Sequence, residues 1–145
     1  MPRKTKPSGK NDVQYARFLR SLELVNIALI ESQAKIDREA FFESDEELLI
    51  KAFGRPSKIK KDHFELEALL TVDATKKKKH TNSFHVKAVF VMHIHAKPPF
   101  GRDVLDRFSE HEGRLIVWPY LREYLANLCV RMHVPPILLP LPELE

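Results

Sequence analysis

The sequence predicts an α+β fold, because strand patterns fill its middle and a long helix pattern follows in its last third. Residues 64–72 and 84–94 alternate apolar and polar side chains, which is typical of strands with one buried face. Further along the chain, five apolar residues are spaced three, four, three and four positions apart: Trp118, Leu121, Leu125, Leu128 and Met132. This spacing places all five on one face of a helix.

Length and composition favour one ordinary globular domain. The chain has 145 residues, a formal net charge of +4 and 43% hydrophobic residues. We expect residues 1–10, rich in Lys, Pro, Gly and Ser, to be a disordered basic tail, and residues 11–145 to form a single domain. The chain lacks an apolar run of membrane-spanning length, and Cys129 excludes an internal disulfide because it is the only cysteine. These features fit a cytoplasmic protein.

Residues 11–22 predict a short helix, in which Tyr15, Phe18 and Leu22 share one face. Residues 24–37 then take on strand character. Strict alternation would place four of their apolar side chains on one face: Ala28, Ile30, Ala34 and Ile36. The first half of this strand is apolar on both faces, which predicts either cover on both sides or an edge that meets another subunit.

Residues 39–53 fit a strand and a helical turn equally well, because the apolar run at 48–53 is too short for its period to decide. Residues 54–57, Gly-Arg-Pro-Ser, indicate a turn. The two firm strands that follow are joined by a short loop, which favours an antiparallel hairpin. Acidic side chains on the first strand would then face Lys87 and histidines on the second.

The C-terminal third predicts a short helix over 103–110 that stops at Gly113, and a main helix over 118–132. Pro119 suits the first turn of the main helix, where its missing N–H is not needed. Pro135 and Pro136 force an extended exit. The apolar stripe of the main helix either packs against a helix of another chain or lies on the sheet of its own domain, and both interpretations remain open.

No constellation in the sequence calls for catalysis or a cofactor. His85, His93 and His95 share a strand face, but no further ligands complete a metal site, so we expect no metal. Cys129 beside His111 or His133 is better explained as a small buried thiol than as a nucleophile. The lysine-rich runs at 3–10 and 76–79 offer the alternative of a basic nucleic-acid-binding or regulatory module.

A composite motif in the last third resembles the SecB family of export chaperones. It begins with a glycine, an apolar pair and Pro-Tyr followed by Arg-Glu: Gly113, Leu115, Ile116, Pro119, Tyr120, Arg122 and Glu123. It continues with a helix-ending arginine, a proline pair and a Leu-Pro tail: Arg131, Pro135, Pro136, Leu139 and Pro140. The resemblance extends over residues 15–141 and is strongest after Gly113.

This resemblance implies a four-stranded antiparallel sheet with a long helix on one face, in which residues 48–53 form the second strand. It also implies an ATP-independent holding chaperone for unfolded clients, such as preproteins or an antitoxin, that assembles as a dimer of dimers. The tetramer interface would then contain Trp118, Leu121, Leu125, Leu128 and Met132. The client groove would contain Phe41, Phe42, Leu48, Ile50, Phe53, Pro135, Pro136 and Leu138.

The chain also departs from the family. Its end at Glu145 leaves the second long helix of the family absent or reduced to a stub. Among the acidic positions that dock the translocation motor ATPase in export members, Glu31 is kept, whereas Lys35 and Lys87 reverse the sign. The added N-terminal helix and basic net charge resemble members that guard antitoxins. We therefore expect chaperone activity more firmly than motor-coupled export.

Overall fold

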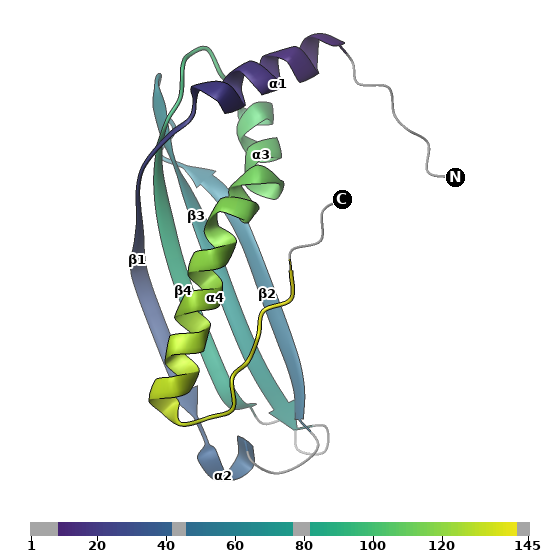
Figure 1. The fold of residues 1–145 in the computed structure, drawn as a ribbon, viewed down its shortest axis with the longest axis vertical. Helices are drawn as coiled ribbons and strands as arrows, with labels where there is room; N and C mark the ends of the chain where they lie inside the picture. The colour runs from purple at the N-terminus through teal and green to yellow at the C-terminus, as the bar shows by residue number, and fades with distance from the viewer. Residues whose placement is uncertain (1–8, 42–45, 77–81, 142–145) are drawn as a thin grey trace, which may run out of the picture.

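The computed structural model describes residues 9–41, 46–76 and 82–141 as an α+β fold, in agreement with the sequence prediction (Figure 1). The elements follow in the order α1 (Gly9–Ser21), β1 (Glu23–Ile36), α2 (Arg38–Phe41), β2 (Glu46–Ser57), β3 (His63–Lys76), β4 (Asn82–His95), α3 (Arg102–Glu110) and α4 (Glu112–Met132). An extended tail, residues 134–141, follows α4. Within the described residues, no helix is long and apolar enough to span a bilayer.

The four strands form one antiparallel sheet in the order β1-β4-β3-β2. The predicted hairpin is confirmed as the central pair, β3 and β4. The ambiguous segment at 39–53 contains both elements, since it includes most of helix α2 and the first two-thirds of β2. β1 and β2 are the two edges of the sheet.

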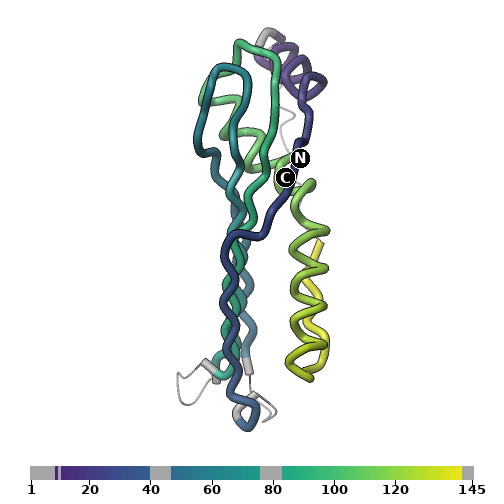
Figure 2. The backbone as a smooth tube through the Cα atoms, turned by 90° about the vertical axis from the view of Figure 1, so that its left-hand side faces the viewer, coloured from purple at the N-terminus to yellow at the C-terminus, as the bar shows by residue number. Residues whose placement is uncertain are grey.

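One face of the sheet carries α4 and the tail, and the other face, here called the outer face, is uncovered by any other described element (Figure 2). Even-numbered residues of β3 and β4 point toward α4 and form the core. Among them Phe64, Leu70, Val72, Phe84 and Val86 are completely buried. Burial on one side only explains the alternation of these strands.

The pairing of β1 with β4 contains two register shifts, between Leu24 and Asn26 and between Leu29 and Glu31. A bulge adds one residue and moves later side chains to the opposite face of the sheet. Ala34 faces the core side, opposite Val86, whereas Ala28 lies opposite Val91 on the outer face. The expectation that Ala28 and Ala34 share a face is therefore wrong.

The turn expected at residues 54–57 is also wrong, because β2 continues through Ser57. Proline is tolerated in a strand at the edge of a sheet, where its missing N–H does not interrupt a ladder on both sides. Pro56 lies on such a strand, opposite Leu66. The chain turns just afterwards, beginning at Lys58, which has a φ of 45°.

The main helix begins six residues earlier than its predicted start at residue 118, so Pro119 lies inside α4 and not in its first turn. Proline leaves the carbonyl four residues earlier, that of Leu115, without its helical partner. Leu115 and Pro119 are both exposed, so water can satisfy this carbonyl. Gly113 does not stop α3; it is the second residue of α4 and is buried.

Helix α1 caps the end of the sheet where α3 begins (Figure 1). Its side chains Tyr15 and Phe18 are buried, and Phe18 joins the rings of Phe64, Phe100 and Phe108 within about 6 Å. These ring contacts bind the N-terminal helix to the core.

Polar contacts reinforce this docking. The Tyr15 hydroxyl donates a hydrogen bond to the Glu112 carboxylate, and the Arg107 guanidinium lies 3.9 Å from the centre of the Tyr15 ring. Arg107 also pairs with Asp12 on α1 at 3.1 Å. Burial and the Glu112 hydrogen bond raise the pKa of Tyr15 above its usual range. Helix α1 is therefore an integral part of the domain.

Candidate functional site

Strand β2 exposes large apolar side chains on both of its faces. Leu48 is 47% exposed, Leu49 is 52% exposed and Phe53 is 53% exposed. Large apolar side chains clustered on an edge strand are unusual on a surface that needs no partner. β2 is therefore a candidate for a surface that contacts another polypeptide.

The structure splits the predicted client groove between the two faces of the sheet. Leu48 and Ile50 lie opposite Ala74 and Val72, so they face the side that α4 covers. Phe53 is three positions from Ile50 and lies opposite Leu69, on the outer face. Strand side chains an odd number of positions apart point to opposite faces, so the side chain of Phe53 points away from the face that Leu48 and Ile50 share.

The remaining predicted groove residues lie outside the sheet. Phe41 is the last residue of α2, whereas Phe42 lies outside the described residues. In the tail, Val134, Ile137 and Leu139 are buried in the core cluster. Pro135, Pro136 and Leu138 are exposed, and Leu138 reaches 71% exposure. Leu138 thus exposes an apolar side chain on a tail that its buried residues anchor to the core.

The apolar stripe of α4 is largely buried within the single chain. Trp118 is 7% exposed, Leu121 1% and Leu125 0%, and they form part of the core cluster with side chains of β3 and β4. These three cannot form the expected interface between chains, because the sheet of their own chain already covers them. Leu128 and Met132 are only partly buried, and Leu115, Tyr120 and Val130 are exposed on the same helix.

An open groove of about 660 Å³ runs beside β2 on the side of the sheet that α4 covers. Its walls come from β2 at Ile50–Phe53, from the α3–α4 junction at Glu110, His111 and Arg114, and from the tail at Pro140 and Leu141. Trp118 forms part of the floor, and its indole Nε1–H donates a hydrogen bond to the Pro140 carbonyl at 2.9 Å. The groove therefore lies where the free edge strand, the helices and the tail meet.

Arg114 gives this groove an unusual polar feature. Its Nε atom is buried and makes no hydrogen bond to any described residue, while its guanidinium lies 5.8 Å from the centre of the Trp118 ring. A buried donor without an acceptor is rare in folded proteins and calls for an explanation. Sequence reasoning missed Arg114, because nothing in a lone arginine on a helix predicts an unpaired donor.

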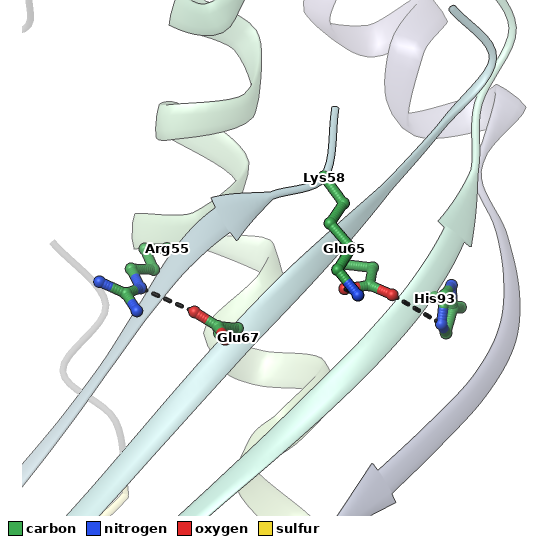
Figure 3. A network of polar contacts seen from close by, with 5 residues as sticks. All are labelled: Arg55, Lys58, Glu65, Glu67 and His93. Atoms are coloured by element: carbon green, nitrogen blue, oxygen red, sulfur yellow. Dashed lines mark hydrogen bonds and ion pairs between the residues drawn. The ribbon is translucent and has the colours of Figure 1, made fainter. Parts of the chain in front are cut away.

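The outer face carries ion pairs in place of a free acidic surface. Figure 3 shows Arg55 beside Glu67, and Glu65 between Lys58 and His93. The Arg55–Glu67 and Glu65–His93 pairs are separated by 2.8 Å, and the Lys58–Glu65 pair by 3.7 Å. His85 pairs with Asp73 at 2.5 Å, which with the His93 pair confirms the predicted match of acids and histidines across the hairpin. Two of the three histidines considered as metal ligands, His85 and His93, are therefore already paired with carboxylates.

The acidic position predicted to dock a motor is itself neutralised. The Lys87 ammonium lies 3.2 Å from the Glu31 carboxylate, on adjacent strands of the outer face. A carboxylate that already has a basic partner offers less attraction to a basic surface. Lys35, opposite His85, adds a further positive charge to this face.

The structure adds no support for a catalytic or metal centre. Cys129 is completely buried in the core, which fits its interpretation as a structural thiol. Among the described residues, no group of three or more potential ligands could hold a metal ion. The two lysine-rich runs lie largely outside the described residues, so the nucleic-acid alternative stays a prediction.

The edge strand β1 also exposes large apolar side chains. Leu24, Val25, Leu29 and Ile30 are each between 41% and 58% exposed. The first half of this strand was expected to be covered on both sides or to meet another subunit, and within one chain it is not covered. In the sequence, the sign of this exposure was a run of apolar residues that does not alternate with polar ones.

Comparison with known proteins identifies the fold. No known family profile matches the chain, and no curated protein matches its sequence. Among solved structures, it is similar to the Mycobacterium tuberculosis Rv1957 SecB-like chaperone in complex with a ChAD peptide from the Rv1956 HigA1 antitoxin, with a TM-score of 0.74 and 16% identity. That match covers 90% of this chain and 96% of the other.

A protein of unknown function from Streptococcus agalactiae is also similar, with 8% identity over 82% of this chain and 96% of that one. Its TM-score of 0.41 is too low to carry an argument. The match to the mycobacterial chaperone extends over most of the chain, so it includes most of the sheet and helices described above. The protein therefore has a SecB-like fold.

Proposed function

We propose that the protein is a holding chaperone that binds unfolded segments of client polypeptides without ATP, a cofactor or a catalytic step. The observation that carries this proposal is the apolar exposure of β2, at Leu48, Leu49 and Phe53, beside an open groove. Apolar surface left open in this way favours association with unfolded chains, which expose the same kind of surface. Binding of this kind keeps clients from aggregating by mass action alone.

The client we propose is a flexible segment of an antitoxin, in preference to a preprotein destined for export. Two observations support this choice. The similar mycobacterial structure holds a peptide from an antitoxin. On the outer face, Glu31 is paired with Lys87, which weakens the case for a translocation motor as partner.

The proposed assembly is a cytoplasmic homotetramer, a dimer of dimers. Within one chain, β1 leaves Leu24, Val25, Leu29 and Ile30 exposed at one edge of the sheet. Helix α4 could contribute only its outward residues, such as Tyr120 and Val130, because Trp118, Leu121 and Leu125 are buried. Light scattering of the purified protein tests this assembly.

The test of chaperone activity is the aggregation of chemically denatured firefly luciferase, diluted into buffer with and without the protein and without ATP. We expect the protein to suppress light scattering from aggregates in proportion to its concentration. Leu48→Asp and Phe53→Asp, tested separately, would show which face of β2 binds the client. The double change Phe41→Asp with Phe42→Asp tests the part of the predicted groove that precedes β2.

Val13→Asp is the matched control, because Val13 is 58% exposed on helix α1, which takes no part in the proposed client surface or assembly. It introduces the same charge at an apolar surface position that the proposal does not use. Suppression should persist in this variant and weaken in at least one β2 variant. If the parent protein fails to slow aggregation at any ratio, the proposed function is wrong.

A further inference from the structure

We infer that a client segment binds as a fifth strand on the free edge of β2, with one of its acceptor groups bonded to Arg114. This inference rests on the proposed function and adds a binding mode and a chemical requirement for the client. The two edge strands of the sheet, β1 and β2, differ in how regularly they pair with their neighbours.

β2 pairs with β3 in a register that runs without a shift from Glu46 opposite Lys76 to Ser57 opposite Glu65. β1, at the other edge, is interrupted by two register shifts. Bulges twist and disrupt an edge and so protect it from pairing with other chains, whereas a regular edge presents a row of unpaired N–H and C=O groups. In β2 this row extends from Glu46 to Arg55, because Pro56 has no N–H. Of the two edges, β2 is therefore the better template for an added strand.

The side chains of β2 suit such an addition. Leu48 is exposed on the face that α4 covers, and Leu49 and Phe53 are exposed on the outer face. An added strand would find apolar neighbours on both faces, as happens when an extended peptide augments a sheet edge. A helical or folded partner could not pair with the backbone groups of the edge, so the occupant must be extended.

The groove beside β2 then assigns a role to Arg114. Its buried Nε donor lacks an acceptor among the described residues, and the groove that Arg114 lines also contains β2 at Ile50–Phe53. A strand added to β2 would bring backbone carbonyls and side chains to this wall. Arg114 as a whole is only partly buried, and a carbonyl or carboxylate of the client would accept a hydrogen bond from the terminal N–H groups of its guanidinium.

The charges along the groove limit which client segments can bind there. Lys51, His111 and Arg114 line it together with one acid, Glu110. A basic client segment would meet like charges there, whereas a neutral or acidic one would not. The expected occupant is an extended segment free of proline, with alternating apolar residues and an acidic residue near Arg114.

Hydrogen exchange of the full chain tests this binding mode directly, because it reports backbone hydrogen bonds and needs no variant. The probe is reduced, carboxymethylated α-lactalbumin, which stays unfolded, and its binding is measured separately by size-exclusion chromatography. We expect the amides of β2 that point away from β3, between residues 46 and 55, to exchange at least about tenfold more slowly when the probe is bound. The amides of residues 23–36 in β1 should change much less.

A second measurement tests Arg114. Arg114→Met keeps the apolar stem of the side chain but removes its donors, and should weaken binding of the probe about tenfold. Arg122→Met is the matched control, since Arg122 is exposed on the same helix and does not line the groove. It should leave the affinity unchanged.

The outcomes separate this inference from the proposed function. Probe binding without slower exchange in β2 overturns the fifth-strand mode and leaves the chaperone proposal standing. Slow exchange in β2 that is already present without the probe and grows with protein concentration overturns it too, because a second copy then occupies the edge. A complete lack of binding overturns both.

Discussion

Trp118 is joined to Pro140 by a hydrogen bond of 2.9 Å from the indole Nε1–H to the backbone carbonyl. This bond links the middle of α4 to the end of the described tail. Residues 135–141 make no backbone–backbone hydrogen bond to other described residues, so side chains alone hold the tail in place. Ile137 and Leu139, both buried, provide the rest of the anchor.

Trp118→Phe should loosen the tail, because phenylalanine fills most of the site but cannot donate the hydrogen bond. Loss of this bond should lower the free energy of unfolding by about 1 kcal/mol, with a further cost for the smaller ring. Limited proteolysis should cut residues 134–141 faster in the variant. Leu138→Ala, at a position 71% exposed, serves as the control and should change neither property. A tail as resistant in the variant as in the parent would contradict this account.

Gly113→Ala should destabilise the protein, because α4 approaches β3 too closely for a methyl group. A Cβ at Gly113 would lie 2.7 Å from Leu66 Cδ2 and 2.9 Å from the Phe108 carbonyl oxygen. Relieving this overlap requires a shift of the backbone, at a cost of about 1–3 kcal/mol. Urea unfolding monitored by circular dichroism measures the change.

Gly9→Ala is the matched control for this substitution, since a Cβ there meets no atom within 4 Å. Because Gly9 begins helix α1, alanine should leave stability unchanged or raise it by up to about 1 kcal/mol. Equal stability of the Gly113→Ala variant and the parent would show that the α4–β3 contact is looser than described.

Leu125→Glu should prevent folding of the single chain. Leu125 is completely buried against the sheet, so the substitution places an unpaired charge in the core at a cost of several kcal/mol. Val130→Glu, five residues along at a position 72% exposed, should fold normally. Circular dichroism and light scattering together distinguish the outcomes. A Leu125→Glu variant that folds fully and forms a smaller species than the parent would favour the interface interpretation instead.

The raised pKa of Tyr15 predicts a loss of stability at alkaline pH. Burial and the hydrogen bond to Glu112 keep the folded hydroxyl protonated, whereas an unfolded tyrosine ionises near its usual value of 10.0. Above that pH the unfolded state loses a proton that the folded state keeps, so the free energy of unfolding falls as pH rises, by about 1.4 kcal/mol per pH unit from this group.

Tyr15→Phe removes this contribution and isolates it from that of other titrating groups, which both proteins share. Urea unfolding between about pH 9 and pH 11.5 should show a steeper decline for the parent than for the variant. Below the usual tyrosine pKa, the variant should be less stable, because it lacks the hydrogen bond to Glu112. Parallel declines in the two proteins would rule out a raised pKa for Tyr15.

The spacing of side chains was sufficient to predict those elements whose pattern depends only on their own residues. β3 and β4 alternate because one face is buried, and that alternation identified the hairpin, its buried residues and the acid–histidine pairs. The motif around Gly113 and Pro119 identified the fold class, and the apolar spacing found the buried face of α4. In each case the evidence lies in the spacing of side chains along one segment.

What each face of an element meets depends on how the whole chain packs. The stripe of Trp118, Leu121 and Leu125 has the same spacing whether it packs on its own sheet or on another chain. In the structure it packs on the sheet of its own chain. Bulges in β1 moved Ala28 to the outer face, and the edge position of β2 accepted Pro56 within a strand. The unpaired donor of Arg114 likewise arises where segments distant in sequence meet. Such features depend on contacts between segments that are distant in sequence, so the pattern within one segment cannot predict them.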